Sequence, residues 1–195
     1  MKDKTSIICV LDRSGSMNPL INDAIGGFNK FLEEQKALPG EAEMTVVLFD
    51  DKYDVIANGK DIQKIEPLNN KTYVPRGMTA LYDALGKTIN EAGARFSNMP
   101  ETEKPDKVIC VILTDGAENS SHEFTREKIV EMTKLQQETY NWEFVYLGAN
   151  QDAIAVGGSI GINVRNCVNY TADSRGTAGA YAVTSCRVSN HRRQV

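Results

Sequence analysis

The sequence predicts an α/β fold, a doubly wound three-layer sandwich in which a mostly parallel sheet is covered by helices on both faces. Two observations carry this prediction. Residues 7–11 (IICVL) and 108–113 (VICVIL) are apolar at successive positions, as expected of parallel strands buried on both faces. Strand and helix patterns also alternate along the chain, which favours right-handed crossovers and the strand order 3-2-1-4-5-6.

The expected elements follow one another in a regular order. After a first strand at 5–11, helix 19–38 carries apolar residues such as Phe28 and Leu32 at core-facing spacing. Strands 44–49 and 53–57 are joined by a short acidic turn, so they form an antiparallel hairpin at one edge of the sheet. Downstream, strands are expected at 108–113, 143–147 and 164–168, and helices at 80–96, 127–139, 153–159 and 177–188. Gly179 and Thr184 weaken the last helix.

Length and composition predict one globular domain. A chain of 195 residues, 41% apolar and 25% charged, suits a single domain over 1–195 with its core between about residues 5 and 170. The net charge of -4 argues against nucleic-acid binding, and the basic stretch 187–193 is interpreted as a solvated terminus. No window reaches the roughly 18 apolar residues of a membrane span.

The location is predicted to be cytoplasmic. Residues 1–4 (MKDK) lead directly into the first strand, which leaves no room for a secretory signal. The four cysteines, Cys9, Cys110, Cys167 and Cys186, are widely separated and are interpreted as reduced thiols. A monomer is the default expectation.

The most informative motif follows the first strand, where Asp12, Ser14 and Ser16 share one tight turn. Carboxylate and hydroxyl oxygens are hard donors, which magnesium, manganese or calcium prefer. Only one of the three donors is charged, so a divalent ion held there stays electron-poor and available to a further ligand. In the expected strand order, Asp115 flanks the same crevice, and Thr79 reaches it from the loop above.

Three segments in this order resemble the metal-ion-dependent adhesion site of von Willebrand factor A domains: DRSGS at 12–16, GMTAL at 77–81 and LTDG at 113–116. The resemblance implies that Ser14 and Ser16 coordinate the metal and that Thr79 does so directly or through water. It implies that Asp12 and Asp115 mainly accept hydrogen bonds from metal-bound waters and from the serines. The implied function of this bacterial or phage stand-alone type is to bind a protein partner, whose Asp or Glu completes the coordination of Mg²⁺ (or Mn²⁺ or Ca²⁺).

Six residues near the motifs are expected to form the rim that contacts the partner: Arg13, Met17, Arg76, Met78, Glu118 and Asn119. A plainer interpretation is that Asp12, Ser14 and Thr79 only cap helices. The acidic cluster at 50–54 is interpreted as a solvated hairpin turn, because Asp is a preferred turn residue.

An alternative function is a phosphotransferase or phosphatase that uses Asp12 as its nucleophile on a similar sheet. Such enzymes need a second nearby acid and a lysine to steady the phosphoryl group. Here Ser14 occupies the second acid position, and Gly148, Ala149 and Asn150 follow the fifth strand without a lysine. Phosphate-binding glycine motifs are also absent after the strands. The sequence therefore favours a binding module over an enzyme.

Overall fold

The computed structural model describes residues 4–149 and 152–193. Its strands are β1 (Lys4–Asp12), β2 (Glu41–Phe49), β3 (Tyr53–Asp61), β4 (Lys107–Thr114), β5 (Glu143–Ala149) and β6 (Cys167–Tyr170). Its α-helices are α1 (Ile21–Lys36), α2 (Leu81–Asn98), α3 (Arg126–Tyr140), α4 (Ala153–Ser159) and α5 (Ser174–Arg193). Of the residues considered above, 1–3 of the N-terminal segment 1–4 and Asn150 after the fifth strand lie outside the described residues.

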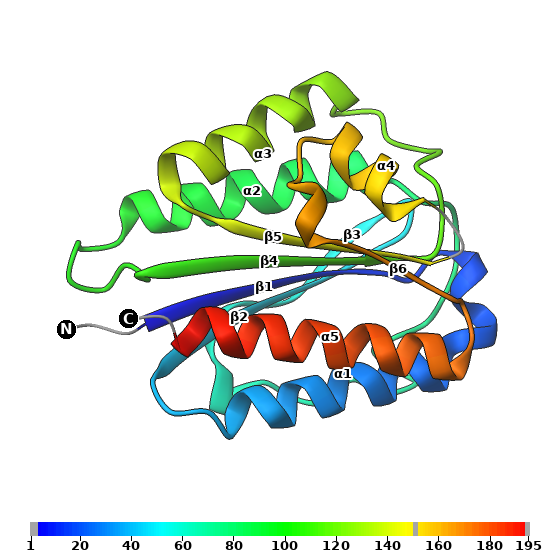
Figure 1. Cartoon of the computed structure of the whole chain (residues 1–195), viewed down its shortest axis with the longest axis horizontal. Coiled ribbons are helices and arrows are strands. Elements are labelled where there is room, and N and C mark those ends of the chain that lie inside the picture. The colour runs from blue at the N-terminus through cyan, green and yellow to red at the C-terminus, as the bar shows by residue number, and fades with distance from the viewer. Residues whose placement is uncertain (1–3, 150–151, 194–195) are drawn as a thin grey trace.

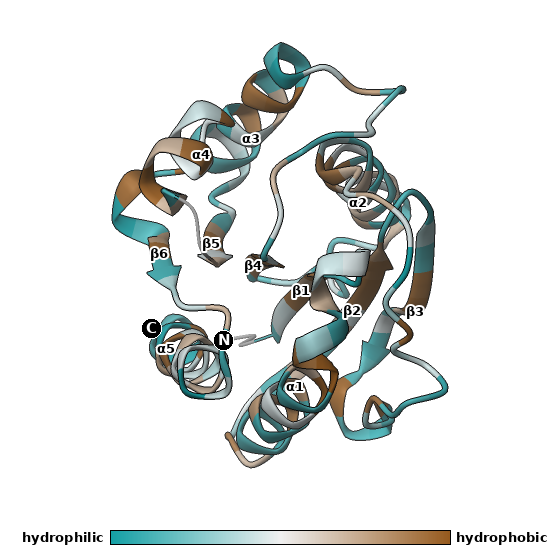
Figure 2. Cartoon of the chain, turned by 90° about the vertical axis from the view of Figure 1, so that its right-hand side faces the viewer, coloured by the Kyte–Doolittle hydropathy of each residue, from teal (hydrophilic) through white to brown (hydrophobic). Residues whose placement is uncertain are grey.

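One six-stranded sheet in the order β3-β2-β1-β4-β5-β6 forms the centre of the molecule (Figure 1). Among the described strands only β2 and β3 pair antiparallel, so the predicted order and the antiparallel edge strand are confirmed. In the central register Leu11 lies opposite Leu113, and Asp12 lies opposite Phe49. The carboxyl ends of β1, β2 and β4 therefore meet at one edge, onto which Figure 2 looks.

Helices cover both faces of the sheet. Helices α1 and α5 lie against one face, and α2, α3 and α4 lie against the other (Figures 1 and 2). Alternate residues of β1 serve the two layers: Ile7 and Cys9 pack in the α1/α5 layer, whereas Ile8 and Val10 pack in the α2/α3 layer. Burial on both faces explains why the central strands carry unbroken apolar runs.

The start of α1 differs from the prediction. A 3₁₀ turn over Gly15–Leu20 contains Pro19, and the α-helix begins only at Ile21. Proline fits this first turn because its missing N–H has no intrahelical partner there. The turn leaves Ser16 exposed at the edge of the sheet.

Helix α5 is longer than predicted and contains the whole of 177–188. It buries Ala180, Tyr181 and Val188 against the α1 layer, and this packing outweighs the low helix propensity of its glycines. The stretch 187–193 is the end of this helix, so its interpretation as a solvated terminus is wrong. Arg192 in particular is 4% exposed, and its guanidinium donates to the carbonyl of Gln35 at 2.6 Å.

The last strand and the edge strand also shift from their predicted bounds. Strand β6 begins at Cys167, after a short 3₁₀ turn over Val164–Asn166, and β3 extends to Asp61. Among the described residues, no helix combines the length and apolar character that crossing a membrane requires.

Candidate metal centre

Three segments bring oxygen donors to the carboxyl edge of the sheet. Asp12 ends β1, and Ser14 and Ser16 follow it in the turn before α1. The Ser14 and Ser16 hydroxyl oxygens lie 3.0 Å apart, and the Ser16 hydroxyl donates to Asp115 Oδ1 at 2.7 Å. The turn after β1 and the end of β4 are thus in direct side-chain contact, across 99 residues of sequence.

Thr79 approaches the same place from the loop before α2. A Cβ atom built on Gly116 would lie 3.0 Å from Thr79 Oγ1 and 3.7 Å from Ser16 Oγ, so both hydroxyls border the space above Gly116. The backbone N–H of Thr79 donates to Asn119 Oδ1 at 2.9 Å, which fixes its position. The structure therefore gathers all five predicted residues, Asp12, Ser14, Ser16, Thr79 and Asp115, at one edge; this set is here called the candidate metal site.

Asp12 is fully buried and held by two donors. The Thr114 hydroxyl donates to Asp12 Oδ2 at 2.6 Å, and the Ser14 backbone N–H donates to Asp12 Oδ1 at 2.7 Å. Burial nevertheless raises the pKa of Asp12 to about 6, against the opposing effect of these bonds, and the nearby Asp115 carboxylate adds to the rise. Burial also raises the pKa of Asp115. The two carboxylates thus lack compensating positive charge, which a divalent cation would supply.

The donor set fits a hard cation. It consists of three hydroxyls and two carboxylates, with no nitrogen or sulfur. Across the described residues, no group of three or more His, Cys, Asp or Glu side chains is placed to hold a metal. The set therefore differs from carboxylate-rich or thiolate sites and has low negative charge.

Helix capping does not account for these residues. Ser14 precedes the 3₁₀ turn and Ala80, not Thr79, precedes α2, yet neither makes a side-chain capping bond. The Ser14 hydroxyl instead contacts the Ser16 hydroxyl, and the Asp12 carboxylate accepts from the Thr114 hydroxyl and the Ser14 backbone N–H.

The predicted rim divides into exposed and buried residues. Arg76 and Met78 are about half exposed, at 46% of the side chain and 52% of the residue. Arg13 and Met17 were predicted on the rim, and this is wrong: they are 5% and 0% exposed, so a partner cannot reach them. The arginine turns inward because the buried Asp50 carboxylate pairs with it, and the methionine because its side chain joins the core.

Glu118 and Asn119 hold the loop after β4 in place. The Glu118 carboxylate accepts backbone N–H bonds from Tyr82, Ser120 and Ser121 at 2.8–2.9 Å. Asn119 is exposed, and its side chain accepts the Thr79 N–H described above. Both residues therefore position the site, whatever they contact outside it.

A charged quartet, consisting of Arg13, Asp50, Asp54 and Arg76, joins the loops below the site. Asp50 is fully buried, and its Oδ2 accepts from Arg13 Nε and from Arg76 Nε, each at 2.9 Å. Asp54 contacts both guanidinium groups from the start of β3. The interpretation of residues 50–54 as a solvated turn is therefore wrong for Asp50. The available sequence signal was the position of Asp50 directly after the apolar strand that becomes β2.

Backbone hydrogen bonds strengthen the same connection. Gly15 N–H donates to Gly77 O at 3.1 Å, and Arg76 N–H donates to Arg13 O at 2.9 Å. Gly77 has a φ of +66°, and a Cβ there would lie 1.8 Å from Asp51 Oδ1, so the loop requires glycine. The turn after β1 and the loop that carries Thr79 are thus joined through backbone hydrogen bonds.

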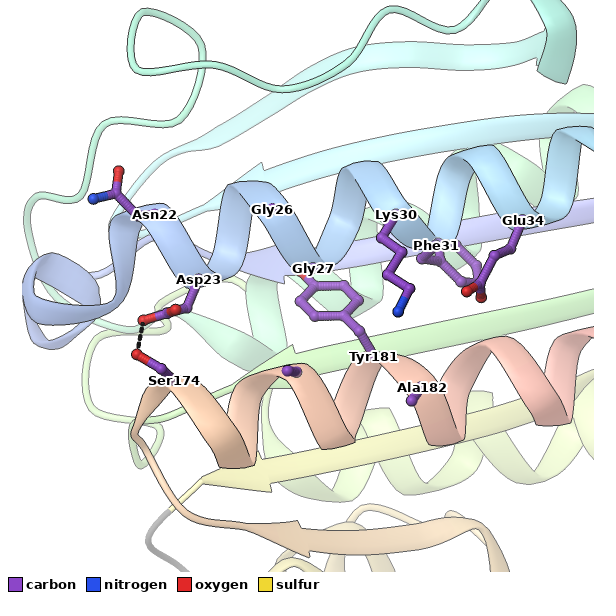
Figure 3. A pocket seen from close by; sticks show the side chains of 11 residues that line it. Asn22, Asp23, Gly26, Gly27, Lys30, Phe31, Glu34, Ser174, Tyr181 and Ala182 are labelled. Atoms are coloured by element: carbon purple, nitrogen blue, oxygen red, sulfur yellow. Dashed lines mark hydrogen bonds between the residues drawn. The ribbon is translucent and has the colours of Figure 1, made fainter.

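A separate cavity of about 240 Å³ lies between α1 and α5. Figure 3 shows Tyr181 of α5 reaching across to Gly27 of α1, with Asp23 hydrogen-bonded to Ser174 at one end. None of the residues of the candidate metal site lines this cavity.

No protein-family model matches the chain, and no curated protein matches it in sequence. Solved structures do match. The vWF domain of the type V pili tip protein Mfa5 from Porphyromonas gingivalis aligns with a TM-score of 0.65 at 10% identity, over 100% of this chain and 98% of that one. The pilus adhesin SpaC from Lactobacillus rhamnosus GG, in an open conformation, aligns with a TM-score of 0.66 at 14% identity, over 98% of this chain and 30% of that one.

A third match is proximal thread matrix protein 1 from the mussel byssus, with a zinc-occupied MIDAS motif. Its TM-score is 0.63 at 18% identity, over 95% of this chain and 46% of that one. Other structures of the same mussel protein are likewise matched over less than half of their length, 46% and 47%. At these identities the likeness concerns the fold, which is that of von Willebrand factor A domains.

Proposed function

We propose that this chain, which has the fold of von Willebrand factor A domains, is a metal-dependent protein-binding module. The observation that carries the proposal is the direct contact of Ser14, Ser16 and Asp115 beside Thr79 and the buried Asp12. In this proposal the module occupies residues 1–195 as one domain.

The metal is proposed to be Mg²⁺, with Mn²⁺ or Ca²⁺ as substitutes. Ser14, Ser16 and Thr79 would hold it through their hydroxyls, while Asp12 and Asp115 would orient those hydroxyls and the surrounding waters. When bound, the ion supplies a coordination position for an Asp or Glu carboxylate of the protein partner. Because the proposed direct ligands are neutral hydroxyls and the two carboxylates act from outside them, the ion can accept a carboxylate from the partner as a further direct ligand. The zinc-occupied MIDAS of the mussel protein is consistent with divalent-metal binding on this fold.

A non-enzymatic role is favoured over phosphoryl transfer. Asp12 is fully buried and accepts bonds from Thr114 and Ser14, so its oxygens are not free to attack a substrate. Ser14 occupies the sequence position at which such enzymes need a second acid. The matched structures include pilus and byssus proteins, which agrees with a binding role.

We also propose a monomer in the cytoplasm. The four cysteines are free thiols, which suits a reducing compartment, although the matched pilus and byssus proteins have extracellular settings.

The test is thermal unfolding with Mg²⁺ and with chelator, on the wild type, on Ser16→Ala and on the exposed control Ser159→Ala. At a Mg²⁺ concentration of about 100 times Kd, binding adds about 2.7 kcal/mol, or about 5–10 °C in Tm for a chain of this size. Wild type and Ser159→Ala should show this gain. Ser16→Ala should lose this gain, so that its Tm in Mg²⁺ equals its Tm in chelator.

Partner capture from a native lysate then tests the binding function. A protein retained with Mg²⁺, released by chelator and absent with Ser16→Ala supports the proposal. Equal metal stabilisation of wild type and Ser16→Ala contradicts the assigned donors. Phosphate release from a generic phosphate ester that disappears in Asp12→Ala would favour the enzyme instead.

A further inference from the structure

A groove of about 350 Å³ lies beside the candidate metal site, between the start of α1 and the loop before α2. Three asparagines, Asn18, Asn22 and Asn70, line it together with the apolar side chains of Pro19 and Val74. We call it the asparagine groove. None of the described residues that line it is charged.

The groove is continuous with the turn that carries the proposed metal donors. Asn18 lies two residues after Ser16, and its Nδ2 donates to Gly15 O at 2.9 Å. The hydroxyl of Tyr73, in the groove wall, donates to the backbone carbonyl of Asp12 at 2.6 Å. A chain whose carboxylate reaches Ser16 therefore has this hollow directly beside it.

Two of the asparagine amides make no hydrogen bond with the part of the chain that the structure describes. Asn22 and Asn70 are exposed, and within residues 4–149 and 152–193 neither side chain makes a hydrogen bond. In Figure 3 the Asn22 side chain points away from α5, although Asn22 also borders the cavity between α1 and α5. Each amide offers one acceptor and two donors, the complement of a backbone N–H and C=O.

The same face of α1 already binds an extended backbone in this way. Asn29 lies two helical turns after Asn22, and residues seven apart share a helix face. Its Nδ2 donates to Leu68 O at 2.9 Å, and its Oδ1 accepts from Leu68 N at 2.8 Å. Asn22 lies on the same face of the helix, and its side chain pairs with no segment among the described residues.

We propose that the asparagine groove binds an extended, uncharged segment of the protein partner that flanks the acidic residue at the metal. The asparagine amides pair with its backbone, and the exposed Val74 and Pro19 contact its small or apolar side chains. The uncharged lining disfavours Lys, Arg, Asp or Glu at the flanking positions, since a charge there would be desolvated without a counter-charge. This inference rests on the proposed function.

The test uses a phage-displayed library of short random peptides with one fixed central glutamate. Phages are bound in Mg²⁺, eluted with chelator and sequenced. The wild type should enrich uncharged residues on one side of the glutamate. The double variant Asn22→Asp/Asn70→Asp should enrich Lys or Arg on that side, and it should bind the wild-type-selected peptides about tenfold more weakly.

The control is Asn98→Asp, which adds a carboxylate at the exposed end of α2, away from the site edge. It should select the same peptides as the wild type. Folding and metal binding of each variant are checked by the Mg²⁺-induced shift in Tm. Should the double variant lose that shift, Asn22→Asp alone takes its place, because an acidic residue in the first turn of α1 is favourable there.

The outcomes separate the two proposals. If the wild type yields no chelator-eluted peptides, the proposed function fails. If it yields them but the variant selects the same flanking residues, the groove assignment is overturned while the metal-dependent function stands. Enrichment of charged flanking residues by the wild type also overturns it.

Discussion

Replacing Asp12 with asparagine should have opposite effects with and without metal. In chelator the folded protein keeps a proton on this carboxyl up to about pH 6, whereas the unfolded chain releases it near its ordinary value of 3.8. The folded state then binds more protons in this window, so the free energy of unfolding of the wild type falls as pH rises from about 4 to 6. The rise in pKa corresponds to about 3 kcal/mol lost above pH 6.

Asparagine avoids this loss because it carries no charge. Its oxygen can accept the Ser14 N–H, and its amide can donate to Thr114, whose hydroxyl then donates to Gly116 O, already 3.1 Å away. In chelator at pH 8, Asp12→Asn should therefore be more stable than the wild type by up to about 3 kcal/mol. The difference should vanish below about pH 4. In Mg²⁺ the difference in stability should shrink or change sign, because only the wild type gains stability from the metal.

Urea unfolding at several pH values, in chelator and in Mg²⁺, measures both effects. The exposed carboxylate change Glu138→Gln is the control and should show neither. A variant no more stable than the wild type in chelator at pH 8 would refute the argument from burial. Equal stabilisation of both proteins by Mg²⁺ would show that Asp12 does not contribute to metal binding.

Three further predictions concern stability and are checked by urea unfolding. Asp50→Asn should lower the free energy of unfolding by about 3–5 kcal/mol, because it removes the buried carboxylate that pairs with Arg13. A loss below about 1 kcal/mol would contradict the role of the charged quartet in joining the loops. Gly27→Ala should cost at least about 1–3 kcal/mol, because its Cβ would lie 2.1 Å from a ring of α5, whereas Gly26→Ala, with open space, should gain up to about 1 kcal/mol. Glu43→Gln should lower the free energy of unfolding at pH 7, and the difference from the wild type should shrink as pH falls below about 4.5. Burial alone raises the pKa of Glu43, but hydrogen bonds from arginine and lysine lower it overall, so the stabilisation by this carboxylate is lost as pH falls. Parallel pH profiles for the two proteins would count against this pairing.

Local pattern was sufficient to predict most of the fold. The apolar runs identified the central strands, and the short turn at 50–52 placed β3 antiparallel at the edge. The α5 helix was underestimated because its glycines lower local propensity, while its stability comes from packing on α1. Gly27 against Tyr181 shows how closely these two helices approach.

The geometry around the candidate metal site was less accessible to sequence reasoning. Arginine is rarely buried, so Arg13 between two motif residues reads as exposed. Its partner, Asp50, lies 37 residues away, and only the register of β1 with β2 brings the two together. Likewise, no local signal distinguishes the unpaired Asn22 from Asn29, whose contact depends on where the 65–80 loop runs.

The burial of Arg13 limits how the turn after β1 can be transplanted. Grafting residues 12–16 onto another sheet would carry a guanidinium into the host's interior, where nothing equivalent to Asp50 need exist. A lysine in its place would not bridge Asp50 and Asp54 with the same planar fork. The β2–β3 hairpin must therefore be transferred together with the motif. Shortening that hairpin by one residue would displace Asp50 or Asp54 and disturb the site, although no proposed metal ligand would be changed.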